Sequence, residues 1–152
     1  MVLMSACLMG EKCRYDGNDN LIPALTERFK DAVLCCPEVM GGLTTPRPSA
    51  EIVGGNADDV LEGKARIITK TGEDVTEAFV AGAYQTLKLA KEKQVVIAIL
   101  KERSPSCGSC FIYDGTFSGN KIAGAGVATT LLRRHGIRIY SEENFKEGDE
   151  AT

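Results

Sequence analysis

The 152-residue sequence contains no tryptophan and only one histidine, His135. It also lacks any apolar run near the roughly 20 residues that a membrane-spanning helix needs, which argues against an integral membrane protein. The first residues show no basic stretch followed by a cleavage signal, so we expect a cytoplasmic protein without a secretion signal. His135 falls in the last turn of a predicted helix, where a cation suits the helix dipole, and we do not expect it to bind a metal.

The sequence also has no excess of positive charge. It contains 18 Lys and Arg residues and 21 Asp and Glu residues, which gives a net charge of −3. Broad binding to nucleic acid needs excess positive charge, so the composition argues against it. The hydrophobic fraction of 43% is that of an ordinary globular protein, and the length fits one domain. We expect residues 1–145 to form this domain and residues 146–152 to form a charged tail.

Apolar runs alternate with amphipathic segments along the chain. The pattern predicts main strands and helices in alternation, with shorter strands between them. A capping box, Asp74-Val-Thr-Glu77, is expected to start the longest helix. Strands that alternate with helices are typical of a doubly wound α/β domain. We therefore predict a single-domain, Rossmann-like, mostly parallel sheet flanked by helices, with strands at 2–6, 32–36, 51–53, 65–70, 95–100, 111–113 and 137–140 and helices at 23–31, 74–93 and 127–134.

What the sequence does have is six cysteines, which is many for a protein of a reducing compartment. In such a compartment, metal binding or catalysis is a better interpretation than disulfides. Cys7, Cys36 and Cys107 each follow a predicted strand, and the carboxyl ends of parallel strands meet at one edge of a sheet. Neighbouring strand residues point to opposite faces, so we assign Cys36 to the site and Cys35 to the core. We expect the cysteine-bearing loops to converge.

Three thiols from three strand ends fit more than one kind of site. They suit an iron–sulfur cluster in which one iron lacks a protein ligand, and such an iron favours a sulfur-containing substrate. They also suit a non-catalytic zinc site completed by Cys13 or Cys110. Cys107 and Cys110 have the spacing of a redox pair, although the extended segment after them lacks the helix that lowers a thiol pKa. The plainest interpretation is that the cysteines are small buried residues.

Charged and hydroxyl residues follow the same strand ends. Glu38 comes directly after Cys36-Pro37, in a position suited to a general base. Ser104 and Ser106 flank Pro105, where they can cap the turn or orient water or substrate. Several cations fall in these loops, where they can form an anion or phosphate site or can simply be solvated at the surface: Arg14, Arg47, Lys101 and Arg103.

Five ordered motifs resemble the thiouracil desulfidase (TudS) family. They are Ser5-Ala-Cys-Leu-Met-Gly10, Arg14-Tyr-Asp-Gly17, Cys36-Pro-Glu-Val-Met-Gly-Gly-Leu43, Thr45-Pro-Arg-Pro48 and Ser104-Pro-Ser-Cys-Gly108. The resemblance extends from Ser5 to about Glu142. It implies a 4Fe–4S cluster bound by three cysteines with one open iron. The activity it implies is non-redox desulfuration of 4-thiouracil, 2-thiouracil or their nucleoside or nucleotide forms to uracil and hydrosulfide.

Carried over by motif, the resemblance implies that the cluster ligands are Cys7, Cys36 and Cys107. It implies Glu38 and Ser104 as the catalytic pair, and the substrate-binding residues are then expected to be Arg14, Arg47, Ser106 and Lys101. Longer family members carry a further domain and act on thiolated tRNA, so we expect a small thiolated pyrimidine here rather than tRNA. Cys13 and Cys110 lie outside the family's ligand set, and we assign neither as a ligand.

Overall fold

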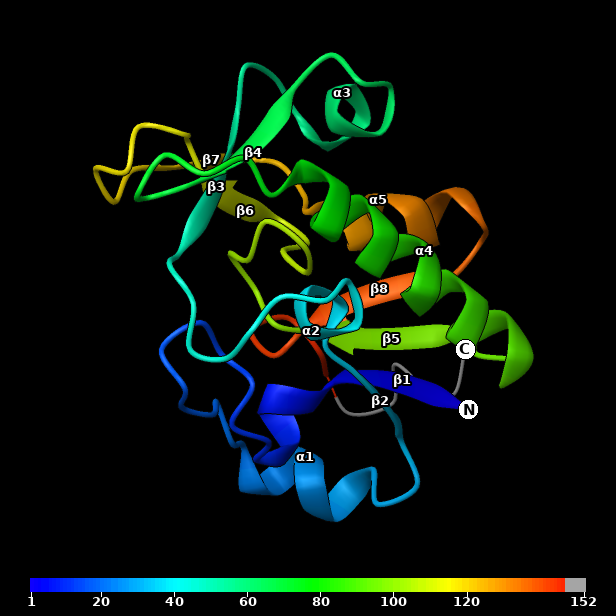
Figure 1. The fold of residues 1–152 in the computed structure, drawn as a ribbon. Helices are drawn as coiled ribbons and strands as arrows, with labels where there is room; N and C mark the ends of the chain where they lie inside the picture. The colour runs from blue at the N-terminus through cyan, green and yellow to red at the C-terminus, as the bar shows by residue number, and fades with distance from the viewer. Residues whose placement is uncertain (147–152) are drawn as a thin grey trace.

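A four-stranded parallel sheet forms the centre of the computed structural model, which describes residues 1–146 (Figure 1). The strand order is β2-β1-β5-β8, and every neighbouring pair is parallel. All four residues of β5 are buried, as expected for a central strand covered on both faces. The predicted α/β fold is confirmed. The strands are β1 (Val2–Ser5), β2 (Val33–Cys35), β5 (Ile97–Leu100) and β8 (Arg138–Ser141).

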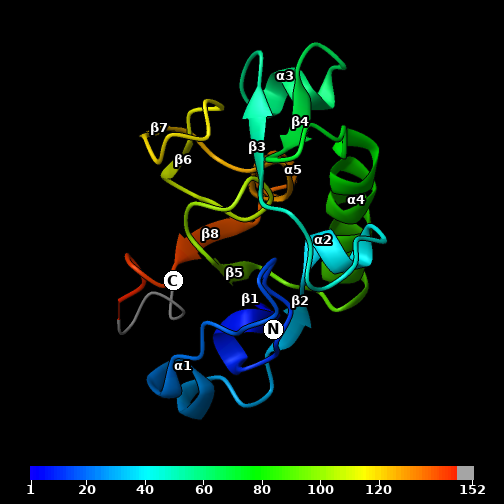
Figure 2. The same ribbon diagram turned by 60° about the vertical axis from the view of Figure 1, so that its left-hand side comes forward.

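Helices cover both faces of this sheet (Figures 1 and 2). Helices α4 (Thr76–Glu92) and α5 (Val127–Arg134) lie on one face, and α1 (Pro23–Arg28) lies on the other. Neighbouring residues of β1 point to opposite faces of the sheet. Leu3 packs in the larger core cluster and Met4 packs in the smaller one. Each face therefore has its own apolar core.

Two antiparallel strand pairs lie beside the α4 and α5 layer, outside the parallel sheet (Figure 2). One pair consists of β3 (Ala50–Val53) and β4 (Arg66–Thr69), and α3 (Ala57–Leu61) lies between them in the chain. The other consists of β6 (Phe111–Tyr113) and β7 (Lys121–Ala123). The sequence did not lead us to expect α3 or β7.

The capping box expected at the start of α4 is wrong. This helix begins at Thr76, and its N-cap Val75 has no side-chain cap. The Asp74 carboxylate instead accepts hydrogen bonds from the Arg66 guanidinium at 2.8 Å and from the Thr76 N–H at 3.0 Å. A reciprocal capping box does occur at α3, where Asn56 and Asp59 each accept a backbone N–H from the other.

A short helix, α2 (Pro37–Met40), also went unpredicted. Pro37 at its first position is preorganised for helix entry. The helix packs on α4 through two glycines, because a Cβ on Gly41 would lie 1.9 Å from the Ala78 carbonyl oxygen and one on Gly82 would lie 1.8 Å from the Pro37 carbonyl oxygen. No larger residue fits this contact, which places Glu38 of α2 relative to the sheet.

The segment after β8 returns to the body of the protein. Glu142 forms an ion pair with Lys101, and the Phe145 ring packs edge-on against Phe29 and Tyr140. The predicted charged tail, 146–152, lies outside the described residues apart from Lys146. Within residues 1–146, no helix has both the length and the apolar character needed to cross a membrane.

Candidate active site

A cavity of about 400 Å³ lies beyond the carboxyl ends of the parallel strands, and Cys7, Cys36 and Cys107 all line it. Cys7 follows β1 in a short 3₁₀ turn, Cys36 is the N-cap residue of α2 after β2, and Cys107 lies in the loop after β5. This is the edge at which α/β sheets bind ligands, and the volume is in the range of small-molecule sites. The structure therefore brings the three predicted thiols to one cavity.

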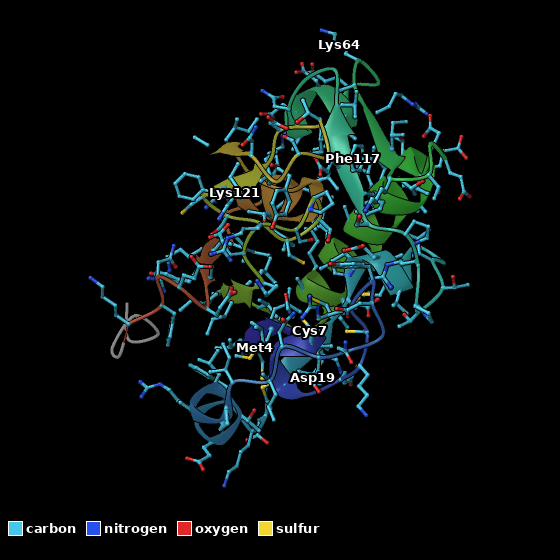
Figure 3. The ribbon with its side chains drawn as sticks, turned by 90° about the vertical axis from the view of Figure 1, so that its left-hand side faces the viewer. Met4, Cys7, Asp19, Lys64, Phe117 and Lys121 are labelled. Carbon is cyan, nitrogen blue, oxygen red and sulfur yellow. The ribbon has the colours of Figure 1, made fainter. Side chains whose placement is uncertain are left out.

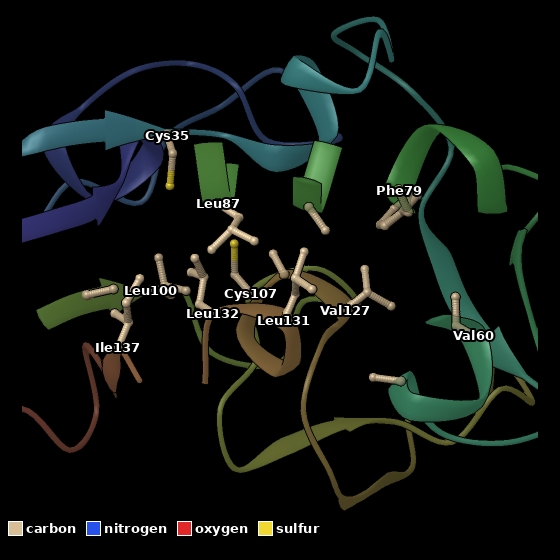
Figure 4. Close-up of a cluster of buried hydrophobic side chains, with 14 of the residues drawn as sticks. Cys35, Val60, Phe79, Leu87, Leu100, Cys107, Val127, Leu131, Leu132 and Ile137 are labelled. Carbon is tan, nitrogen blue, oxygen red and sulfur yellow. The ribbon is translucent and has the colours of Figure 1, made fainter. Parts of the chain in front are cut away.

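Cys35 and Cys36 occupy different environments, as strand alternation predicts. Cys35 is 3% exposed and lies in the core beside Leu87, whereas Cys36 is half-buried (Figure 4). Cys107 lines the cavity but is 5% exposed, and its sulfur points toward the same Leu87 side chain. Burial raises the pKa of the Cys107 thiol, although hydrogen bonds with Ser106 and Ser5 act in the opposite direction. A metal that takes Cys107 as a ligand must therefore displace a proton.

Cys13 contributes a further thiol to the cavity. Its side chain hydrogen-bonds with the side chains of Cys7 and Cys36, and these contacts lower the pKa of Cys7 and lower that of Cys36 to about 7. Cys110, in contrast, is exposed and lies outside the cavity lining. In the described part of the chain, no three His, Cys, Asp or Glu side chains surround a position for one metal ion. A set of soft thiol donors at one cavity suits an iron–sulfur cluster.

The Glu38 carboxylate is held on both of its oxygens. Oε1 accepts a hydrogen bond from Arg47 Nε at 3.2 Å, and Oε2 accepts from Ser106 Oγ at 3.1 Å and from Ser104 Oγ at 3.4 Å. The Arg47 side chain is 6% exposed and that of Glu38 is 18% exposed. A carboxylate fixed by a cation on one side and lined by hydroxyls on the other is suited to moving a proton.

Hydrogen bonds from hydroxyl groups and from the first turn of α5 hold the loop that bears Cys107. Ser104 Oγ accepts hydrogen bonds from the backbone N–H groups of Ser106 and Cys107, both at 3.1 Å. Thr129 of α5 donates its hydroxyl to the Cys107 carbonyl oxygen at 2.8 Å. N–H groups in the first turn of α5 donate to the carbonyls of Pro105 and Ser106. Ser104 therefore both caps the turn and reaches Glu38.

Glu102 is a buried carboxylate that the sequence analysis missed, and it is 3% exposed. It accepts the N–H groups of Ser109 at 2.7 Å and Cys110 at 3.0 Å, together with the Ser109 hydroxyl at 2.8 Å. Burial alone raises its pKa, but hydrogen bonds from Cys110, Ser109 and Phe111 outweigh burial and lower the pKa to about 2. The signal in the sequence was an acidic residue ahead of a Gly- and Ser-rich loop with many free N–H groups.

The cations predicted near the site do line the cavity, but each has protein partners. Lys101 Nζ lies 2.9 Å from a Glu142 oxygen, and Arg14 lies 3.2 Å from an Asp16 oxygen. Arg47 uses four of its five N–H donors, on Glu38, Thr44, Thr45 and Cys13. Each of these cations is thus already engaged with groups of the protein itself. Their binding to substrate stays a prediction.

An aromatic rim, formed by Tyr15, Tyr113 and Phe117, completes the cavity wall and was not predicted. Figure 3 shows Phe117 in the upper part of the molecule and Cys7 below it, and both residues line the cavity. The Glu51 carboxylate accepts the Phe117 N–H at 3.2 Å and the Gly115 N–H at 2.9 Å, which fixes the turn that carries Phe117. Aromatic side chains on a cavity wall suit a flat heterocyclic ring.

Comparison with known proteins agrees with this geometry. The family model described as 2-thiouracil desulfurase matches residues 2–144. The uncharacterized protein YbbK of Bacillus subtilis (strain 168) is 51% identical over 150 residues, which is 97% of this chain and 99% of that protein. A solved structure named as a [4Fe-4S]-dependent thiouracil desulfidase, TudS, is 42% identical and has a TM-score of 0.86 over 99% of this chain and 95% of its own.

Proposed function

Because the chain belongs to the 2-thiouracil desulfurase family, we propose that it is an enzyme that removes sulfur from a thiolated uracil with the help of a 4Fe–4S cluster. The observation that carries the proposal is one cavity in which Cys7, Cys36 and Cys107 lie together with the fixed carboxylate of Glu38. The similarity to a solved thiouracil desulfidase supports both the chemistry and the cofactor.

The three cysteines would hold the cluster and leave one iron without a ligand from these three residues. Such a cluster supplies a soft Lewis acid, which favours the sulfur of a thiocarbonyl group over oxygen or nitrogen. Cys7 and Cys36 already have lowered pKa values, while Cys107 has to lose its proton on loading. The thiols thus differ in how readily they become ligands.

Glu38 acts as the general base in this proposal. Its Oε2 takes a proton from a water molecule, and the water oxygen then bonds to the thiocarbonyl carbon. The proton on Glu38 passes to the sulfur of this adduct. The carbon–sulfur bond then breaks and hydrosulfide leaves, while the hydroxyl proton of the adduct passes to Glu38 as the carbonyl of uracil forms and is afterwards released to solvent. No electron is gained or lost, because water supplies both the new oxygen and the protons. Ser104 and Ser106 lie at hydrogen-bond distance from Glu38 Oε2 and orient the water.

The cavity favours a small thiolated pyrimidine as substrate. Its aromatic rim suits the flat ring, and its volume of about 400 Å³ suits a base, nucleoside or nucleotide. Arg14, Lys101 and the remaining Arg47 donor lie on the wall and provide polar contacts to such a substrate. The net charge of −3 gives no support for a large RNA footprint.

The test is to purify the protein without oxygen and to measure iron, acid-labile sulfide and visible absorption. About four irons and four sulfides per chain, with a broad brown band, are expected. Release of sulfide from 4-thiouracil, with uracil as the other product, is then expected at equal molar amounts. One zinc ion, no colour and no sulfide release would contradict the proposal and favour a non-catalytic metal domain. Loss of activity in Cys110→Ser would instead favour a thiol redox protein, since Cys110 lies outside the cavity lining.

A further inference from the structure

Three carboxylates of the described chain line the cavity, and they differ in how many of their oxygens accept hydrogen bonds from the protein. Both oxygens of Glu38 and both of Glu102 do so. In Glu51, only Oε1 does. We propose that Glu51 is a substrate-recognition residue whose second oxygen, Oε2, accepts the N–H group at ring nitrogen 3 of the pyrimidine. This inference rests on the proposed function and deepens it by naming a residue that determines specificity.

Glu51 faces the cavity from β3, which lies outside the parallel sheet. Its neighbour Ile52 packs in the larger core cluster, and successive strand residues point to opposite faces. Glu51 is only 8% exposed, so its carboxylate is largely removed from bulk water. Within residues 1–146, Oε2 has neither a hydrogen-bond donor nor an ion-pair partner. A buried acceptor of this kind has a desolvation cost, which an N–H group of a ligand in the cavity removes.

The other oxygen fixes the Glu51 carboxylate against the turn between β6 and β7. Oε1 accepts the Gly115 N–H at 2.9 Å and the Phe117 N–H at 3.2 Å. The turn lies so close to β3 that a Cβ on Gly115 would be 2.6 Å from the Ile52 carbonyl oxygen. Phe117 has a φ of 57°, a left-handed conformation that is uncommon for a bulky residue. One carboxylate therefore holds the turn that carries Phe117 and keeps its second oxygen for a ring that packs on this aromatic wall.

The N–H group at ring nitrogen 3 is the donor that all the candidate substrates share. Ring nitrogen 1 carries the ribose in a nucleoside or nucleotide, whereas ring nitrogen 3 keeps its proton. Ring nitrogen 3 also lies between the two carbonyl-type carbons, so it is next to the thiocarbonyl in both 2-thiouracil and 4-thiouracil. A carboxylate oxygen that accepts this N–H selects rings with a donor at that position. It disfavours rings with an acceptor there, such as cytosine.

The experiment measures the binding of uracil, 1-methyluracil and 3-methyluracil to the full chain by titration calorimetry. Uracil contains no sulfur, so its binding can be measured on loaded and on cluster-free protein. The wild type is expected to bind 1-methyluracil as it binds uracil. It is expected to bind 3-methyluracil about 10- to 100-fold more weakly, because a hydrogen bond to a charged group is lost. Equal binding of uracil and 3-methyluracil by the wild type overturns the inference.

The variant Glu51→Gln separates recognition of the N–H group from steric effects of the methyl group. Glutamine still accepts the N–H groups of Gly115 and Phe117, and its amide NH₂ then takes the place of Oε2. Uracil is expected to bind this variant about 10- to 100-fold more weakly than it binds the wild type. The further loss on methylation at ring nitrogen 3 is expected to shrink to about twofold or less. Cytosine is expected to bind the variant better than uracil does, the reverse of the wild-type preference.

Asp114→Asn is the matched control, because Asp114 accepts hydrogen bonds from Thr116 in the same turn but lies outside the cavity lining. It is expected to bind uracil as the wild type does. A fall as large as that of Glu51→Gln shows that the turn, and not the acceptor oxygen, governs binding, and this result overturns the inference. A methylation loss of wild-type size in Glu51→Gln overturns it as well.

The same measurements distinguish failure of this inference from failure of the proposed function. A wild-type protein that binds no iron and sulfide but discriminates against 3-methyluracil overturns the proposed function and supports the role of Glu51 in ring recognition. A loaded wild-type protein that releases sulfide from 4-thiouracil but binds uracil and 3-methyluracil equally supports the proposed function and overturns the role of Glu51. A wild-type protein that binds neither uracil nor 4-thiouracil overturns both.

Discussion

Gly41 and Gly82 bring helices α2 and α4 into direct backbone contact. A Cβ on Gly82 would lie 1.8 Å from the Pro37 carbonyl oxygen and 3.2 Å from the Gly41 backbone nitrogen. Because Glu38 is on α2, this contact determines how far the carboxylate stands from the cysteine-bearing loops. The position of the proposed general base thus depends on a glycine of α4 that lines no part of the cavity.

Replacement of Gly82 by alanine is expected to destabilise the protein by about 2 to 3 kcal/mol, because overpacking at a rigid contact outweighs the roughly 1 kcal/mol that alanine gains in a helix. Urea unfolding of the cluster-free protein measures this change. Gln85→Ala, at an exposed position of the same helix, is the control and is expected to be nearly neutral. If Gly82→Ala has the same free energy of unfolding as the wild type, then α2 and α4 can move apart without loss of stability.

Replacement of Glu38 by glutamine is expected to lower kcat by about 10²- to 10⁴-fold, the usual contribution of a general base. Glutamine keeps the size of the side chain but cannot accept the proton at Oε2. Sulfide release gives kcat, and iron content measured on the same sample is expected to stay unchanged. Glu11→Gln, an exposed residue outside the cavity lining, is the control. Full activity of Glu38→Gln would remove this residue from the mechanism.

Replacement of Arg47 by lysine is expected to lower kcat by about 10- to 100-fold with little change in KM. Lysine keeps the charge but cannot reproduce the fork that contacts Glu38, Thr44, Thr45 and Cys13. Steady-state kinetics separates the two constants. A raised KM with unchanged kcat would instead identify Arg47 as a substrate-binding residue. Arg66→Lys, whose exposed ion pair with Asp74 lies away from the cavity, is the control.

Replacement of Glu102 by glutamine is expected to cost stability at neutral pH but not in acid. The pKa of Glu102 falls from 4.5 in the reference state to about 2 in the folded protein, so its ionised form stabilises the fold by about 3 kcal/mol above pH 4.5. This contribution is lost as the pH falls from about 4.5 to about 2, because the carboxylate then takes up a proton. The difference in free energy of unfolding between wild type and Glu102→Gln should shrink over that range in the cluster-free protein.

The matched control for Glu102 is Glu27→Gln, at an exposed position of α1. The free energy of unfolding of Glu27→Gln should differ little from that of the wild type at neutral pH. A constant difference between wild type and Glu102→Gln at all pH values would mean that packing, and not charge, makes Glu102 important.

The parts of the fold that periodicity controls could be predicted from the sequence. The apolar runs gave the four parallel strands, and α5 occupies the predicted residues 127–134. Helix α2 could not be predicted because four residues carry no periodicity and its position depends on a long-range glycine contact. Strand β7 is exposed at all three residues and so shows no alternation. The contact that positions α2 therefore lies far away in the chain, whereas β7 pairs with the nearby strand β6 and lacks only a sequence pattern of its own.

The part of the candidate site that follows directly from the ends of the parallel strands could be predicted from the sequence. Cys7, Cys36 and Cys107 could be placed at one edge because parallel strands end there together. The partners of Glu102 and the contacts of Cys13 could not, since both depend on how loops fold back on themselves. The ion pairs of Lys101 and Arg14 were missed for the same reason, and these residues looked uncommitted in the sequence.

The two antiparallel strand pairs stand apart from the parallel sheet, and this separation has a consequence for evolution. The thiols come from the ends of the sheet, whereas Tyr113 and Phe117 belong to the β6–β7 pair and its connecting turn. A change in the length or composition of that turn can alter which pyrimidine is accepted while the cysteines stay in place. Relatives that keep these cysteines can therefore differ in the substrate ring that they accept through changes in this one hairpin.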